Sequence, residues 1–117
     1  MPFVHVSSNV ARASVDADAV ARVIAKTLAG ALDAPEHLVA VLLSLEQPML
    51  FAKKGDPCAF VDIRSIQVAT ADKPAAVKAI TATVAEALGV PAKRIFVNMQ
   101  QIVPTHWGFN GITAARL

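Results

Sequence analysis

Two segments that lie 56 residues apart follow one pattern, and this repetition decides the fold. The first is ALDAPEHLVAV, residues 31–41, and the second is ALGVPAKRIFV, residues 87–97. Each reads as a helix end, a turn that contains proline, a polar pair and an apolar strand. The same offset places the apolar stretch at residues 3–6 on residues 59–62. The sequence therefore predicts a strand–helix–strand unit that is used twice, each with parallel strands.

Each unit is predicted to contain one amphipathic helix. Asp16 and Asp72 stand near the helix starts, where acids are favoured, and Gly89 with Pro91 marks the end of the second helix. The apolar residues between these signals recur at the spacing of one helical face. The predicted stripes are Val20, Val23, Ile24, Thr27, Leu28, Ala31 and Leu32 in the first helix and Val77, Ile80, Val84 and Leu88 in the second.

The strand at residues 38–45, LVAVLLSL, is apolar almost without alternation, and residues 59–63 and 95–99 are nearly so. Strands of this kind are typically buried on both faces. Two helices cover only one face of a four-stranded sheet, so the other face is predicted to be an apolar surface covered by further subunits. We therefore expect an α/β fold with both helices on one face and an oligomeric assembly.

Length and composition fit one domain, residues 1–117, with repeat units at about 2–45 and 58–99 and a tail at 100–117. The net charge is only +2 and no basic run occurs, so nucleic acid is not an expected partner. No apolar stretch reaches 18 residues and no signal peptide is recognisable, which predicts a cytoplasmic protein without membrane insertion. Cys58 is the only cysteine and is expected to be a buried apolar residue.

The common chemical motifs are absent, so no metal and no cofactor are expected. His5, His37 and His106 are far apart and lack metal-ligand spacing, and we interpret them as three unrelated residues. No glycine-rich nucleotide loop is present. Ser65 lies in IRSIQV without the turn of a serine hydrolase.

The remaining candidate for chemistry is Pro2. Initiator methionine is usually removed before a small residue, and its removal would expose the Pro2 nitrogen as a secondary amine. Burial or a nearby cation lowers the pKa of an amine toward neutrality, where a general base is most useful. The alternative interpretation is that Pro2 only begins an edge strand, where its missing N–H has no cost. Position alone favours that alternative.

The tail, QQIVPTHWGFNGITAARL, is broken into short pieces by Pro104, Gly108 and Gly111. Two interpretations stay open from the residues alone. Trp107 and Phe109 either pack the tail onto a neighbouring surface or form the wall of a pocket.

Several of these stretches together resemble the family of macrophage migration inhibitory factor and D-dopachrome tautomerase. MPFVHVSSNVARASV is similar to the start of that family, and DPCAFVDIRSI is similar to the first strand of its second unit. VPAKRIFVNM and HWGFNG match its last long strand and its tail. The resemblance covers nearly the whole chain in register.

The resemblance implies a homotrimer in which each subunit contributes a four-stranded mixed sheet and the three sheets wrap into a barrel. It implies tautomerase activity on phenylpyruvate-type keto acids or dopachrome analogues, with Pro2 as general base and then acid. A cytokine-like role, with a cell-surface receptor and export without a signal peptide, is implied as well. The site residues that it implies are Pro2, Phe3, Ser65, Ile66, Phe96, Asn98, Trp107 and Phe109.

Departures from the family pattern affect the site. The family usually has a lysine where Ala34 stands, and that lysine would bind a carboxylate. Phe96 stands where a tyrosine is common, and Ala114 stands near a usual tail phenylalanine. Val61 replaces the second cysteine of a Cys-x-x-Cys pair seen in some members, so thiol–disulfide activity is not supported.

We take Arg64 as the candidate for the missing positive charge, although adjacent strand residues such as Arg64 and Ser65 face opposite sides of a sheet. Arg94 is a weaker candidate. Without either, carboxylates should bind about one to two decades more weakly. The alternative functions are a signalling or binding protein with a vestigial tautomerase site, and a tautomerase for an uncharged substrate.

Overall fold

The computed structural model describes residues 1–117 and contains two helices of equal length that lie 56 residues apart, α1 (Ala17–Leu32) and α2 (Lys73–Leu88). Each helix begins after an aspartate whose carboxylate accepts a hydrogen bond from a backbone N–H. Asp16 accepts from Ala19 at 3.2 Å, and Asp72 accepts from Ala75 at 3.1 Å. These contacts satisfy N–H groups that have no partner within the helix. The predicted helix starts are confirmed.

Four strands, β1 (Phe3–Ser8), β2 (Ala40–Ser44), β3 (Ala59–Ser65) and β4 (Ile95–Gln101), form one sheet in the order β2-β1-β3-β4. Strands β1 and β2 are parallel, as are β3 and β4, while β1 and β3 are antiparallel. Each βαβ unit therefore supplies a parallel pair, and the two units join through their first strands. The predicted four-stranded mixed sheet is confirmed.

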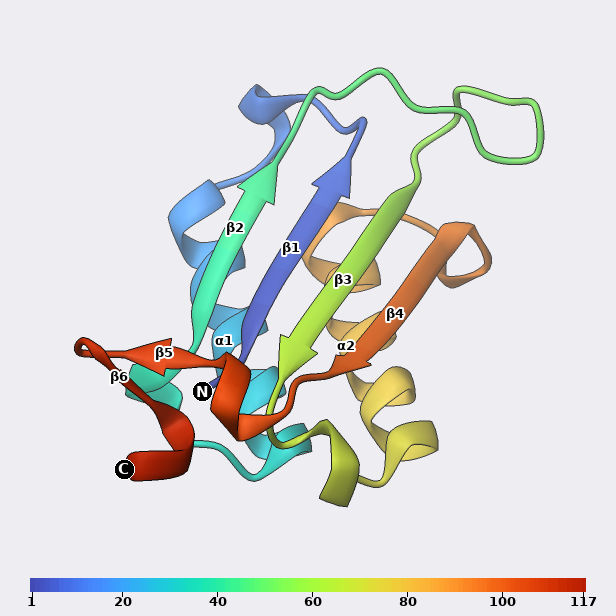
Figure 1. The fold of residues 1–117 in the computed structure, drawn as a ribbon. Coiled ribbons are helices and arrows are strands. Elements are labelled where there is room, and N and C mark those ends of the chain that lie inside the picture. The colour runs from blue at the N-terminus through green and yellow to red at the C-terminus, as the bar shows by residue number, and fades with distance from the viewer.

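Both helices pack on the same face of the sheet (Figure 1). The core between the layers contains Val4, Val6, Ile24, Leu28, Val61, Ile63, Ile80 and Val84, which are all inaccessible to solvent. Two residues of the predicted helix stripes lie outside this core, since Val23 and Val77 are 42% and 37% exposed. Val23 lies at the edge of the first stripe and Val77 lies near the start of α2, whereas the small residues Ala29 and Ala76 are buried.

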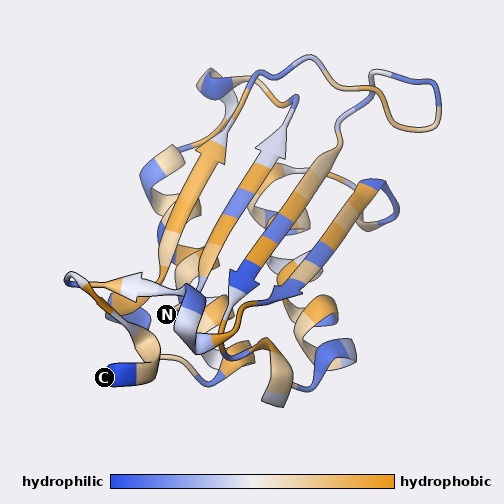
Figure 2. Cartoon of the chain, in the orientation of Figure 1, coloured by the Kyte–Doolittle hydropathy of each residue, from blue (hydrophilic) through white to orange (hydrophobic).

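The other face of the sheet is open in the single chain, and its predicted covering by further subunits stays a prediction. Along β3 the buried residues Val61 and Ile63 alternate with the more accessible Phe60, Asp62 and Arg64. Figure 2 shows this alternation of hydrophobic and hydrophilic positions along β1 and β3. The open face is therefore partly polar, and its apolar residues are interrupted by charged ones.

The predicted strand at residues 38–45 was too long. The structure has a single 3-10 turn at Glu36–Leu38, and β2 begins only at Ala40. The apolar character of Leu38 and Val39 has another cause, because both residues line a cavity at this end of the sheet.

Helices α1 and α2 meet through a hydrogen bond between equivalent residues of the two units. The hydroxyls of Thr27 and Thr83 lie 2.9 Å apart and partly buried. We expect Thr27→Val to lower the free energy of unfolding by about 1 kcal/mol, because one hydroxyl loses its partner. The double variant Thr27→Val/Thr83→Val should recover most of this loss, since neither side chain then has an unsatisfied polar group. Urea unfolding of the wild type, Thr27→Val, Thr83→Val and the double variant measures the coupling energy between the two hydroxyls. Additive losses in the double variant would contradict this explanation.

Candidate active site

The first strand begins directly after Pro2, and the structure extends its pairing by one hydrogen bond. The backbone N–H of Ala40 donates to the Pro2 carbonyl at 3.0 Å, which continues the parallel pairing of β1 with β2. Neither the side chain of Pro2 nor that of Val4 is accessible to solvent. The local sequence therefore holds the proline rigidly at the end of the sheet.

A cavity of about 330 Å³ lies beside Pro2. It is lined by Met1 and Pro2, by residues 37–40 and by residues 107–109, so three segments far apart in the chain meet here. Figure 1 shows how this happens, because the tail crosses the sheet end close to the N-terminus. A concave and mainly apolar space with few polar groups is the usual form of a small-molecule site.

The tail reaches the cavity through a short hairpin of β5 (Gly108–Phe109) and β6 (Ile112–Thr113). Asn110 and Gly111 connect these strands with positive φ angles of 52° and 80°, as a tight two-residue turn requires. The Ala114 N–H donates to the carbonyl of Trp107 at 2.7 Å and closes the hairpin. Trp107 and Phe109 line the cavity, which favours the pocket-wall interpretation of the tail.

Other candidate residues lie near this cavity but on different surfaces. Phe3 and Arg64 are partners across β1 and β3 on the open face of the sheet. Ser65 faces the helices and is fully buried, and Ile66 follows it in the turn after β3. The single chain therefore brings Pro2, Trp107 and Phe109 together at the cavity, while Phe3, which follows Pro2, pairs with Arg64 on the open face.

Phe96 lies toward the other end of the sheet, and Asn98 lies near its middle, in register with Asp62 and His5. Phe96 pairs with Phe60, which pairs with Ser7, so Phe96 is four residues along β1 from Phe3, or roughly 13 Å. Its side chain is 59% exposed and packs against Phe51 with ring centroids 4.7 Å apart. The single chain does not bring Phe96 to Pro2, and their predicted common site requires a second subunit.

The two arginines considered as replacement cations are both engaged elsewhere. The Arg64 guanidinium lies 3.3 Å from the carboxylate of Asp62, and Asn98 donates to the same carboxylate at 2.9 Å. Arg94 is only 8% exposed and donates to the backbone carbonyls of residues 51, 54, 56 and 57. Neither arginine lines the cavity beside Pro2. Ala34 packs against the core and supplies no polar group.

The amino terminus itself has a polar environment that sequence analysis missed. The terminal ammonium of Met1 donates to the Gln67 side-chain oxygen at 2.9 Å, and the buried Ser65 hydroxyl donates to the same oxygen. Partial burial lowers the pKa of the Met1 amine from its ordinary value of 8.0. Between the pKa of this amine in the folded protein and 8.0, the unfolded chain binds more protons than the folded protein. The free energy of unfolding therefore increases as the pH rises through this range.

His37 is a second residue that sequence analysis did not assign to the site. It was interpreted as one of three unrelated histidines, but it lines the cavity with Pro2. The repeat comparison offered a signal, since residues 36–37 form the polar pair directly before the strand that pairs with Pro2.

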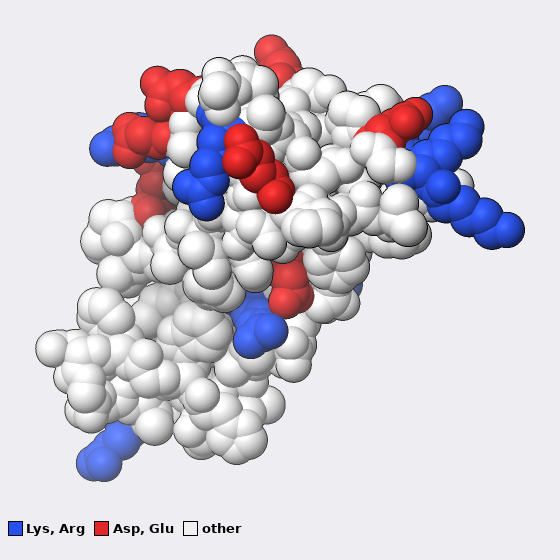
Figure 3. Space-filling view, turned by 90° about the horizontal axis from the view of Figure 1, so that it is seen from above, with Lys and Arg blue, Asp and Glu red and all other residues white.

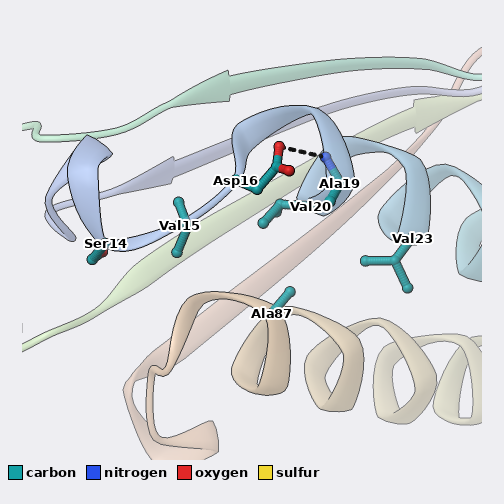
Figure 4. A pocket seen from close by; sticks show the side chains of 7 residues that line it. All are labelled: Ser14, Val15, Asp16, Ala19, Val20, Val23 and Ala87. Carbon is teal, nitrogen blue, oxygen red and sulfur yellow. Dashed lines mark hydrogen bonds between the residues drawn. The ribbon is translucent and has the colours of Figure 1, made fainter.

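A second cavity, of about 340 Å³, lies between the helices (Figure 4). It is lined mainly by Ala19, Val20, Val23 and Ala87. Its only ionisable residue is Asp16, whose carboxylate accepts the hydrogen bond that begins α1. This cavity therefore offers no group for acid–base chemistry.

Figure 3 shows acidic and basic side chains interspersed over one end of the molecule, with a small basic group at one corner. No cluster of three or more metal-ligating side chains is found. No helix has both the length and the apolar character that would be needed to cross a bilayer.

Two βαβ units joined in one mixed sheet, with the buried Pro2 beside a cavity, are the features of the tautomerase fold among small α/β proteins. The sequence model described as "Macrophage migration inhibitory factor (MIF)" matches residues 1–115. The chain belongs to the macrophage migration inhibitory factor family. Membership supports an isomerase of the tautomerase type and cytokine-related properties at the level of the family.

Relatives and solved structures agree with this assignment. The chain is 29% identical over 116 residues to the macrophage migration inhibitory factor of Xenopus tropicalis, covering 98% of this chain and 100% of the relative. It is 30% identical to that of Meriones unguiculatus with the same coverage. The structure matches the Toxoplasma gondii protein with a TM-score of 0.82 at 28% identity, covering 95% of this chain and 98% of that one. The Trichinella spiralis protein, with a TM-score of 0.87 at 20% identity over 95% of this chain and 98% of that one, supports the fold alone.

Proposed function

We propose that this protein is a tautomerase that converts phenylpyruvate-type or dopachrome-type keto compounds, with Pro2 as general acid and base. The observation that carries the proposal is the position of Pro2, fully buried at the wall of a cavity that Trp107 and Phe109 also line. An aromatic substrate fits between such side chains, and its carbonyl end would lie toward the proline. No metal or cofactor is needed for this proton transfer.

The proposed reaction moves one proton from carbon to oxygen. After removal of Met1, the neutral Pro2 nitrogen takes a proton from the carbon next to the substrate carbonyl, and an enolate forms. The resulting secondary ammonium then donates a proton to the enolate oxygen, which gives the enol and regenerates the amine. The burial that lowers the pKa of the Met1 amine would also favour a neutral Pro2 amine near pH 7.

We further propose a homotrimer in which a neighbouring subunit supplies Phe96 and Asn98 to each site, with Phe3, Arg64, Ser65 and Ile66 from the first subunit. The distance of Phe96 from Pro2 within one chain supports a shared site. The exposed positions Phe60, Leu42 and Phe96 on the open face are the surface that such an assembly would cover. The proposed location is the cytoplasm, with export that does not use a signal peptide.

A test compares two forms of the protein whose first residue is established by intact mass. The first form has lost Met1, and the second carries a leucine inserted after Met1, which prevents removal of the methionine. We expect enolisation of phenylpyruvate and hydroxyphenylpyruvate only in the first form, because in the second the Pro2 nitrogen is an amide without a basic electron pair. Equal rates in both forms would overturn the proposal.

A second candidate function is a signalling or binding protein whose tautomerase site is vestigial. The absence of lysine and arginine from the cavity favours it, because an anionic substrate lacks a permanent positive charge there. Full enolisation of a carboxylate substrate by the form without Met1 would contradict a vestigial site.

A further inference from the structure

The cavity beside Pro2 contains a single ionisable side chain. Its wall includes Pro2, which precedes β1, Val39 and Ala40 at the start of β2, and residues 107–109 of the tail. None of these side chains carries a charge. His37 is the exception, and it lies exposed at the 3-10 turn that precedes β2.

The charged groups around His37 are few. The terminal amine of Met1 is the only other titratable group that lines the cavity. Glu36, on the same turn, is exposed and does not line the cavity. The Arg64 guanidinium is paired with Asp62, and the Arg94 guanidinium is bound to backbone carbonyls. After removal of Met1, the imidazole is therefore the one ionisable side chain at this cavity, beside the backbone amine of Pro2 and the neutral indole N–H of Trp107.

The imidazole and the aromatic wall together select a type of ligand. Trp107 and Phe109 offer apolar area for a ring, while a protonated imidazole attracts an anionic group and donates a hydrogen bond to it. Histidine exchanges its proton in the range of physiological pH, so this attraction would depend on pH. A small molecule with an aromatic ring and one carboxylate combines both features.

We propose that His37 determines the substrate class of this site by receiving the carboxylate of an aromatic acid whose ring packs between Trp107 and Phe109. The inference rests on the proposed tautomerase function and adds to it the residue that receives the carboxylate, at the end of the substrate opposite its ring. His37 is a specificity-determining residue and takes no part in proton transfer. Because it is exposed, solvent screens its charge, and we expect an effect of about two- to fivefold on affinity.

The test uses two probes of equal size that do not react, 3-phenylpropionate and its neutral amide. Their affinities are measured by NMR titration of the indole N–H of Trp107, the only tryptophan, at about pH 5.5 and about pH 8. The wild-type protein should bind the acid about two- to fivefold more tightly than the amide at the lower pH and lose this preference at the higher pH. His37→Gln should lower the preference to the part that a protonated Pro2 amine supplies, and His37→Lys should keep the full preference at both pH values.

His106→Gln is the matched control, because His106 is exposed in the tail but does not line the cavity. It should bind both probes as the wild type does. An acid preference that is as large in His37→Gln as in the wild type would overturn the inference, and so would failure of the wild-type protein to bind either probe up to its solubility. The probes are not converted by the protein, so their binding is measured independently of catalysis. If the protein shows the His37-dependent preference but does not enolise phenylpyruvate, the proposed activity is refuted and the binding inference stands.

Discussion

Replacing Pro2 by glycine is expected to lower kcat/KM for the enolisation of phenylpyruvate by about 10²-fold. The proposed general base is the N-terminal secondary amine, and a positioned acid–base group contributes about 10²–10⁴-fold to rate. Glycine also permits removal of Met1, so the variant keeps a primary amine. The loss should therefore lie at the lower end of this range, whereas the form with inserted leucine, which has no basic nitrogen at this position, should lie at the upper end.

The loss in the glycine variant has two physical sources. The pyrrolidine ring is fully buried and fixes the direction of the nitrogen lone pair, and glycine removes the ring and with it this fixed direction. A misplaced base lowers kcat with little change in KM, because the cavity walls formed by Trp107 and Phe109 stay in place.

Pro48→Gly is the matched control for this substitution. Pro48 is exposed in the segment after β2 and does not line the cavity, so its replacement should leave kcat/KM unchanged. We would measure steady-state enolisation rates of the wild type, Pro2→Gly and Pro48→Gly, and thermal unfolding would verify that each variant is folded. A Pro2→Gly protein that is folded and as active as the wild type would remove Pro2 from the mechanism.

Replacing Arg94 by alanine is expected to lower the free energy of unfolding by about 3 kcal/mol. The guanidinium donates to the carbonyls of residues 51, 54, 56 and 57 at 3.0–3.2 Å and lies 5.2 Å from the ring centroid of Phe51. Alanine removes these four hydrogen bonds and the cation–π contact, and it leaves the Pro57 carbonyl without the donor that Arg94 supplies. The turn at Ala52 and Lys53, which both have positive φ angles, loses the contacts that hold it in this unusual conformation.

Arg94→Lys and Arg22→Ala separate the causes of this loss. Lysine keeps the positive charge but lacks the planar arrangement of donors, so its loss should be intermediate. Arg22 forms an ion pair with Asp18 at 2.7 Å on the exposed surface of α1, and its replacement should leave the unfolding midpoint unchanged. Urea unfolding is measured at one protein concentration, because the stability of an oligomer depends on concentration. An Arg94→Ala protein as stable as Arg22→Ala would contradict a structural role for Arg94.

The identity of residue 94 shows the limit of reasoning from charge alone. From the sequence, Arg94 was a candidate to bind a substrate carboxylate. The structure buries it against backbone carbonyls that come from a loop about 40 residues earlier in the chain. No local pattern indicates such a contact, because it depends on how the loop at residues 51–57 folds over the start of β4.

The open face of the sheet shows a similar limit for apolar patterns. The apolar runs in β2, β3 and β4 predicted burial on both faces. The structure confirms burial toward the helices, but the other face alternates Phe60 with Asp62 and Arg64. A run of apolar residues identifies a strand, while the exposure of each face depends on the neighbouring layers.

The sequence by itself determined the repeated βαβ unit, because its helix caps, turns and strands recur at one offset and each of these signals is local in origin. It also indicated Pro2 as the candidate general base, because the place of a residue in the chain is known without the fold. Only the tertiary structure decided that the tail places Trp107 and Phe109 beside Pro2, that His37 lines the same cavity and that Arg94 does not. These are contacts between segments distant in sequence, and they arise from packing around one shared core, which no short stretch of the chain encodes.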